Sequence, residues 1–221
     1  MTVSQYILLA FPAILVILNP LGAATNFLAL TTSHTEEEKL HIAKRACLTA
    51  FCVLVIFALA GHFIFQIFHI TLSAFRIAGG IIIFGVGLNM LKLQPLRIKQ
   101  TDEEMKENLL RTDVAVVPLG IPLLSGPGAI TTVMVLMTEI DKKSTLTGVF
   151  EVAGLLISCI LSLVLIYFIF INSKKLLDLL KVTGVGVMTR IMGLIMTVIA
   201  TQFIINGIKD LLPELAQILS K

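Results

Sequence analysis

Six apolar runs, separated by shorter polar segments, make up most of this chain. Each run has about 20 or more residues, which at 1.5 Å per residue is enough for a helix to cross the hydrocarbon core of a bilayer. The pattern therefore predicts an all-α polytopic membrane protein with six transmembrane helices. The expected spans are residues 5–31, 46–68, 72–91, 114–137, 146–171 and 187–208.

The first and fourth runs are interrupted near their centres. Residues 19–22 read N-P-L-G, and residues 116–132 contain three prolines and three glycines. Proline removes a backbone donor and clashes with the preceding turn, and glycine weakens a helix interior by about 1 kcal/mol. We therefore expect the first and fourth helices to be discontinuous. Because lipid offers no hydrogen-bond partners to freed backbone groups, both breaks should face the inside of the protein.

Two polar segments carry a helix-start signal. Residues 35–38 (T-E-E-E) and 101–104 (T-D-E-E) each place a threonine three positions before a glutamate, which is the spacing of a capping box. The first predicts a helix that starts in water and continues into the second span. The second falls in the polar loop at residues 92–113.

Composition and charge agree with a membrane location. Hydrophobic residues make up 57% of the chain and charged residues 14%, whereas soluble domains have about 25% charged residues. The net charge is only +3, without a basic patch, so we expect no nucleic-acid partner. Eleven lysines and arginines fall in the first, third and fifth connections, against four on the other side. The positive-inside rule then places both termini outside.

The two halves of the chain share two motifs in the same order. Residues 19–23 (N-P-L-G-A) correspond to 126–129 (G-P-G-A), and residues 76–79 (R-I-A-G) correspond to 190–193 (R-I-M-G). Three spans per half force the second copy to enter from the opposite face, so we expect a 3+3 inverted repeat, as in many secondary transporters. The alternative is a coincidence of glycines and prolines. The expected units are a first repeat at 1–91, a cytoplasmic linker loop at 92–113 and a second repeat at 114–221.

The two breaks form the candidate substrate-binding site. A helix that restarts after a break presents unpaired N–H groups and about half a positive charge, which suits a carboxylate. Carbonyl groups released before the prolines could accept from an ammonium group, so a zwitterionic amino acid fits such a pair. Alternatively, the breaks are packing kinks and the nearby hydroxyls bond to their own helix. The candidate residues are Asn19, Pro20, Gly22, Ser125, Gly126, Pro127, Gly128 and Thr131.

Three charged residues inside the expected spans are candidates for gating or coupling. Arg76 and Arg190 occupy corresponding positions near a helix start. An arginine there can snorkel to the interface, so structural anchoring stays open beside gating or substrate contact. Glu151 could carry a coupled proton, or it could be an interfacial side chain about two turns into the fifth helix.

Several of these motifs together resemble the MarC family of integral membrane proteins. The likeness runs from about residue 6 to residue 210. It implies a prokaryotic cytoplasmic (inner) membrane protein that is grouped with the lysine-exporter-like transporters, and transport of small neutral amino acids such as glycine and alanine. The motifs are residues 19–22 (N-P-L-G), 75–80 (F-R-I-A-G-G), 117–119 (V-P-L), 125–130 (S-G-P-G-A-I) and 190–193 (R-I-M-G).

These observations predict a secondary transporter for small neutral amino acids that works by alternating access at a midplane site between the broken helices. Proton coupling and a homo-oligomer are left open. The alternative is a non-transporting membrane scaffold, or a stress or drug-resistance protein that acts through partners. The sequence has no H-E-x-x-H or G-x-S-x-G motif and no acid–base cluster, so we expect neither an enzyme nor a cofactor or metal.

Overall fold

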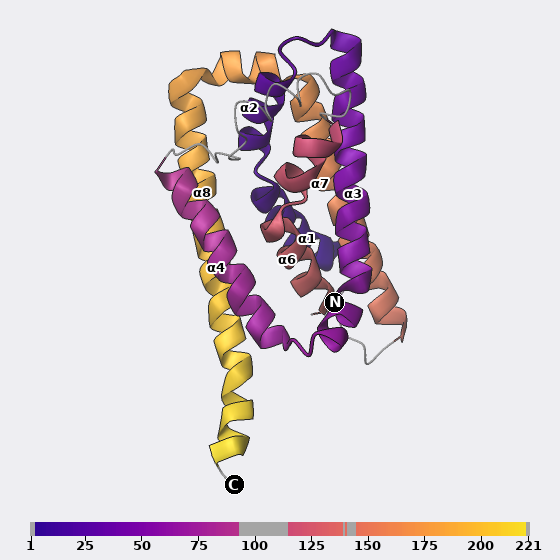
Figure 1. The fold of residues 1–221 in the computed structure, drawn as a ribbon, viewed down its shortest axis with the longest axis vertical. Helices are drawn as coiled ribbons and strands as arrows, with labels where there is room; N and C mark the ends of the chain where they lie inside the picture. Colours follow the sequence, from indigo (N-terminus) through magenta and orange to yellow (C-terminus); the bar gives the residue numbers. More distant parts are fainter. Residues whose placement is uncertain (1–2, 93–114, 139, 141–144, 220–221) are drawn as a thin grey trace.

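Helices make up nearly all of the chain that the computed structural model describes, namely residues 3–92, 115–138, 140 and 145–219. No strand occurs within these ranges. Figure 1 shows the helices side by side in one bundle. They are α1 (Val3–Leu18), α2 (Pro20–Leu30), α3 (Glu36–Ile67), α4 (Leu72–Leu91), η1 (Ala115–Leu124), α6 (Pro127–Thr138), α7 (Thr145–Ile171) and α8 (Ser173–Leu219).

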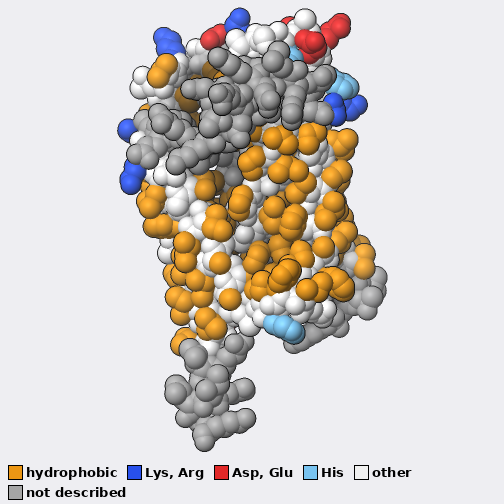
Figure 2. Space-filling view, viewed as in Figure 1, with side chains coloured by type: hydrophobic (Ala, Val, Ile, Leu, Met, Phe, Trp, Pro, Cys, Tyr) orange, Lys and Arg blue, Asp and Glu red, His pale blue; other side chains and the backbone are white. Residues whose placement is uncertain are grey.

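The helices have the length and apolarity that a membrane requires. Five helical segments can cross a bilayer, and a sixth span results if the bent pair of η1 and α6 is counted as one. Figure 2 shows a broad band of hydrophobic side chains, with lysine, arginine and acidic side chains gathered at one end of the molecule. The prediction of an all-α membrane protein is therefore confirmed, with five to six candidate spans in the described residues.

The first apolar run leaves helical geometry at Asn19. This residue has left-handed backbone angles (φ 49°, ψ 69°), and its side-chain oxygen accepts from the N–H of Gly22 at 3.2 Å. Asparagine tolerates this region better than most residues. Pro20 follows as the first residue of α2. The N–H group that proline lacks would have no partner within the helix at this position, so its absence does not weaken α2. The sequence around residue 19 thus ends α1 and starts α2.

The fourth run is irregular along η1. Val117 (φ −127°, ψ 122°) and Ile121 (φ −131°, ψ 123°) are extended within it, because each precedes a proline whose ring excludes the helical region for the preceding residue. The Ser125 hydroxyl donates to the Gly120 carbonyl at 2.8 Å and closes the turn that follows. From Pro127 the chain continues as α6, at 57° to η1.

Of the two capping boxes that the sequence predicted, the structure describes one. At Thr35 and Glu38 both hydrogen bonds of the capping box are present, and α3 starts there, as predicted. The signal at residues 101–104 lies outside the described residues.

Residues 173–180 and 182–186 are helical on either side of Lys181, although the sequence predicted a loop before the sixth span. Ser173 is buried, and Leu176, Leu177 and Leu180 are half-buried, so this segment has one apolar face at helical spacing against the bundle. At Lys181 (φ 55°, ψ 173°) the chain leaves helical geometry, and Figure 1 shows α8 turning there from a course across the bundle to a course along it.

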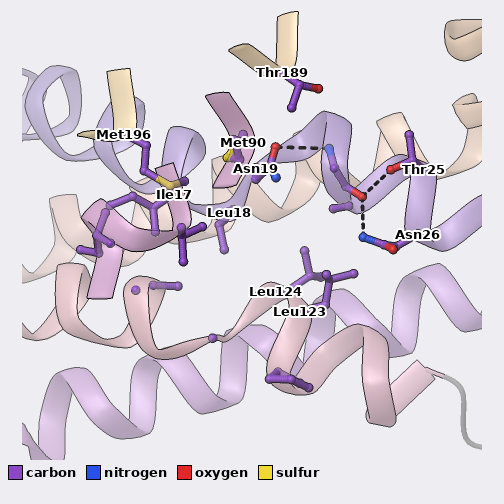
Figure 3. A pocket seen from close by; sticks show the side chains of 18 of the residues that line it. Ile17, Leu18, Asn19, Thr25, Asn26, Met90, Leu123, Leu124, Thr189 and Met196 are labelled. Atoms are coloured by element: carbon purple, nitrogen blue, oxygen red, sulfur yellow. Dashed lines mark hydrogen bonds between the residues drawn. The ribbon is translucent and has the colours of Figure 1, made fainter. Parts of the chain in front are cut away.

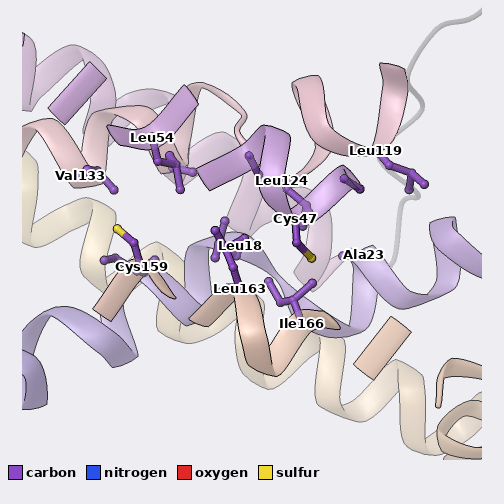
Figure 4. Close-up of a cluster of buried hydrophobic side chains, with 14 of the residues drawn as sticks. Leu18, Ala23, Cys47, Leu54, Leu119, Leu124, Val133, Cys159, Leu163 and Ile166 are labelled. Carbon is purple, nitrogen blue, oxygen red and sulfur yellow. The ribbon is translucent and has the colours of Figure 1, made fainter. Parts of the chain in front are cut away.

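The bundle has two groups of helices. In the larger group α1, α2, α3, η1, α6 and α7 share one hydrophobic core, in which Leu18 lies with Leu163 and Ile166 of α7 (Figure 4). Phe27 stacks on Phe170 with ring centroids 4.5 Å apart. In the other group α4 packs lengthwise against α8.

The two helix backbones of the α4–α8 pair approach closely at glycines. A Cβ atom on Gly80 or Gly87 would lie 2.8 and 2.9 Å from the carbonyl oxygens of Ala200 and Gly193. Gly207 of α8 faces Ser73 at the start of α4 in the same way. These pairings run in opposite directions along the two helices, so α4 and α8 are antiparallel.

The start of α1 and the end of α8 lie at the same end of the molecule, and α8 continues past the bundle there (Figure 1). The end with the basic side chains is the opposite one (Figure 2). This arrangement fits an even number of spans. That both termini face the outside of the cell stays a prediction.

Candidate functional site

A cavity of about 570 Å³ lies where the starts of α2 and α6 face the α4–α8 pair. Figure 3 shows it from close by. Its size falls within the range of small-molecule sites in proteins, about 300–1,000 Å³. Val182, which is 91% exposed, lies at its rim near the turn in α8.

One wall of the cavity consists of the first turns of α2. The Gly22 carbonyl accepts from the Thr25 hydroxyl at 2.8 Å and from the Asn26 amide at 2.9 Å. The Asn19 side chain bonds to the Gly22 N–H from the other side. These bonds, drawn in Figure 3, hold three polar side chains in fixed positions along the cavity.

A second wall is the start of α6. Pro127 is its first residue, and the Ile130 N–H is the first to bond back along the chain, to the Gly126 carbonyl at 3.0 Å. The N–H groups of Gly128 and Ala129 belong to the first turn, which has no intrahelical acceptors. Both residues line the cavity, so the positive end of the α6 dipole faces it.

The remaining walls are mostly aliphatic. They come from the end of α1, from α4, from the end of η1 and from α8, with Thr189 as a further polar side chain. None of the described lining residues carries a formal charge. These aliphatic lining residues are Ile17, Leu18, Ile82, Ile83, Val86, Met90, Leu123, Leu124, Val182, Val185 and Met196.

Five of the eight candidate substrate-binding residues line this cavity and three do not. Pro20 is buried at the start of α2, and Ser125 is bonded to Gly120 in the turn before α6. Thr131 packs against Gly79 of α4, where a Cβ atom would lie 1.9 Å from the Thr131 methyl group. The five that line the cavity are Asn19, Gly22, Gly126, Pro127 and Gly128.

The three charged candidates are not among the described residues that line the cavity. Arg76 is 9% exposed and forms an ion pair with Asp210, which joins the start of α4 to α8. Arg190 is exposed on α8, so the two arginines of the shared motif have different surroundings. Glu151 is 3% exposed in α7, and the choice between a coupled proton and an interfacial side chain stays a prediction.

Sequence reasoning missed the contribution of α4 and α8 to the cavity. Ile83, Val86 and Met196 are ordinary apolar residues in the sequence, and nothing marks them as a binding wall. A usable signal was the glycine pattern of the two helices, since Gly80, Gly87 and Gly193 allow the close pairing that places these side chains together. Within the described residues no three of the histidine, cysteine, aspartate and glutamate side chains come together as a metal site would require.

The comparisons with known proteins place this architecture in a family. The family model described as "MarC family integral membrane protein" matches residues 4–212. A UPF0056 membrane protein of Methanocaldococcus jannaschii is 39% identical over 209 residues, which are 94% of this chain and 98% of that protein. The UPF0056 membrane protein YvbG of Bacillus subtilis is 35% identical over 212 residues, which are 96% and 98% of the two chains.

A more distant relative is the UPF0056 membrane protein YhcE of Escherichia coli, 33% identical over 205 residues and 93% of each chain. No solved structure matches. The family model and these relatives cover nearly the whole length of the chain, with the first and fourth apolar runs inside the matched region. The chain therefore belongs to the MarC family of integral membrane proteins.

Proposed function

We propose that this protein is a secondary transporter of small neutral amino acids, of the glycine and alanine class, in the prokaryotic inner membrane. The observation that carries the proposal is that the starts of α2 and α6 face one cavity of about 570 Å³. Paired interrupted helices around a central site are the usual substrate-binding arrangement of such transporters.

The chemistry of the cavity supports a zwitterion. The first-turn N–H groups of Gly128 and Ala129 suit a carboxylate. The oxygens of Asn19 and Thr25 at the opposite wall can accept from an ammonium group. Because no described lining residue is charged, a solute with a net charge would have no counter-ion there, and a solute without net charge is favoured.

The arrangement of helices supports alternating access between two inverted halves. In this proposal residues 1–91 and 114–221 are 3+3 inverted repeats, with discontinuous first and fourth helices. Both α2 and α6 start with proline and run from mid-height toward opposite ends (Figure 1). The third helices, α4 and α8, pack antiparallel. Rocking of one half against the other would expose the cavity to each side in turn.

The test is uptake of labelled glycine and alanine into proteoliposomes, with and without an inward proton gradient. Gly128→Leu places a large side chain in the cavity beside Ile83 and Ile17, which lie 3.2 and 3.5 Å from the position of a Cβ atom. The matched control is Gly85→Leu, since no atom lies within 4 Å of a Cβ there. We expect uptake by the parent and by Gly85→Leu, and loss of uptake in a folded Gly128→Leu variant.

Equal uptake by the two variants would contradict the cavity as the transport site. Uptake that only equilibrates across the membrane would remove proton coupling from the proposal, and with it the role of Glu151. No uptake by the folded, inserted parent would contradict amino-acid transport and favour the alternative, a scaffold that acts through partners.

A further inference from the structure

The first part of α8 lies across the bundle instead of along it. Residues 173–180 are helical, the chain bends at Lys181, and α8 then runs lengthwise beside α4 (Figure 1). The end of the bundle that this part crosses is the end where basic side chains gather (Figure 2). A helix that crosses a bundle of membrane-spanning helices lies roughly in the plane of the membrane. We call residues 173–182 the crossing segment.

The exposed apolar side chains of α8 after the bend indicate how deep the crossing segment lies. They extend from Val187 to Ile208, which are 50% and 49% exposed, a length of about 32 Å at 1.5 Å per residue. The hydrocarbon core of a bilayer is about 30 Å thick, and the headgroups add about 5–7 Å on each side. Val182 lies five positions before Val187, or about 7–8 Å along the helix. The crossing segment is therefore at the level of the lipid headgroups.

The crossing segment has a positive charge that the described residues only partly balance. Lys174, Lys175 and Lys181 are exposed, as is Asp178, so three lysines and one aspartate give the segment a formal charge of +2. Lys174 acts through its charge on Glu36 at the start of α3. Lys175 and Lys181 have no ion-pair partner among the described residues. Their two ammonium groups can therefore meet an anion from outside the chain.

Two large apolar side chains lie next to these lysines and face away from the protein. Leu179 is 79% exposed and Val182 is 91% exposed, and they flank the bend at Lys181. Water around both side chains would be unfavourable. Helices that lie on a membrane surface combine lysines with apolar side chains that enter the boundary between headgroups and acyl chains. The exposed side of the crossing segment thus matches a lipid surface in both its charge and its apolar residues.

We propose that the crossing segment is a binding surface for anionic phospholipids of the leaflet at the basic end. Lys175 and Lys181 bind the headgroup phosphates, and Leu179 and Val182 enter the layer below them. The inference does not depend on what the cavity binds. Since Val182 also lines the cavity, lipid bound here would lie at the cavity rim.

The test uses tryptophan as a reporter, because the chain contains none. Leu179→Trp is reconstituted in phosphatidylcholine vesicles that contain equal fractions of phosphatidylglycerol, with one or the other lipid brominated on its acyl chains close to the headgroup. Bromine quenches tryptophan fluorescence on contact, so the ratio of the two quenching levels gives the lipid preference. A lysine that meets an anionic headgroup should favour the anionic lipid about fivefold, so we expect clearly stronger quenching by brominated phosphatidylglycerol.

The control reporter is Val198→Trp, which is 61% exposed on the same helix after the bend and lies near the middle of the apolar length. We expect it to show no preference between the two lipids. Val182→Trp is the second reporter on the crossing segment and decides the matter if Leu179→Trp does not fold. Equal quenching by the two lipids at the crossing segment would overturn the proposal. Quenching by neither lipid there, beside normal quenching at Val198→Trp, would also overturn it and leave this surface to a water-soluble partner.

The lysines are assigned by adding Lys175→Gln and Lys181→Gln to the Leu179→Trp variant. We expect the preference for phosphatidylglycerol to disappear, because the neutral side chains no longer attract its phosphate. Lys209→Gln removes one exposed lysine near the other end of α8 and should leave the preference unchanged. A preference that survives the double substitution, or one that Lys209→Gln removes, would contradict the assignment to the crossing segment.

Discussion

At the scale of single residues, Asn19 does two things that few side chains can do together. Its backbone takes the left-handed conformation between α1 and α2, and its side-chain oxygen accepts from the Gly22 N–H. The first property is shared with glycine. The second is shared with aspartate, serine and threonine, the other good helix-capping residues.

Replacing Asn19 should therefore separate the two contributions. Asn19→Ala loses the cap and keeps a Cβ in a left-handed conformation, so we expect destabilisation of about 1–3 kcal/mol. Asn19→Gly loses only the side-chain bond and relieves the backbone, so its cost should be smaller. Thermal melting of the purified variants measures both. A glycine variant as unstable as the alanine variant would contradict this account of the break.

At the scale of elements, the pairing of α4 with α8 depends on the absence of side chains at particular glycines. A Cβ on Gly87 would lie 2.9 Å from the backbone oxygen of Gly193, whereas a Cβ on Gly85, two residues away on the same helix, meets nothing within 4 Å. Because a backbone atom cannot move aside as a flexible side chain can, the two helices would have to separate.

We therefore predict opposite effects of the same substitution at two neighbouring positions. Gly87→Ala should destabilise the protein by about 1–3 kcal/mol through overpacking. Gly85→Ala should be neutral or stabilise it by up to about 1 kcal/mol, since alanine is the better helix former. Melting temperatures of the two variants in the same detergent give the comparison. A Gly87→Ala variant as stable as the parent would show that the pairing is looser than described.

The ion pair of Arg76 with Asp210 ties the same two helices together near the end of the molecule where the chain termini lie. Asp210→Ala removes the carboxylate that faces a nearly buried guanidinium, and should cost more stability than Lys209→Ala next to it. A double-mutant cycle with Arg76→Leu and Asp210→Leu should give a coupling energy of about 1–3 kcal/mol. Additive effects of the two changes would mean that the pair does not hold α4 to α8.

At the scale of the whole molecule, the features that the sequence predicted well are those that local chemistry decides. The capping box at Thr35 and Glu38 fixes where α3 begins. Apolar length alone predicts the candidate spans. These signals act within a few residues of the chain, so no knowledge of packing is needed to read them.

The features that the sequence did not predict depend on contacts between distant residues. Arg76 and Arg190 share a local motif, but among the described residues only Arg76 is both buried and in an ion pair, and its partner Asp210 lies 134 positions away along the chain. Ile83 and Met196 meet in the cavity because α4 and α8 pair along their glycines. The pattern of apolar and polar residues predicts neither contact, although the glycines of α4 and α8 are a sequence signal for the second.

The orientation of the whole bundle is the last expectation open to a direct test. Basic side chains gather at one end and the ends of α1 and α8 lie at the other, so the positive-inside rule places the termini outside. In a variant without Cys47, Cys52 and Cys159, a cysteine at the exposed position Lys209 should react with an impermeant maleimide on intact cells.

A cysteine introduced in the same variant at the exposed position Lys174, on the segment of α8 that crosses the basic end, should react only after the membrane is permeabilised. Because both positions are exposed and lie toward opposite ends of the bundle, the comparison tests which end faces the outside. If only the cysteine at position 174 were labelled in intact cells, the orientation would be opposite to the predicted one. In that case the cavity rim at Val182, which adjoins this segment, would open toward the outside, and the described conformation would receive its solute from outside the cell.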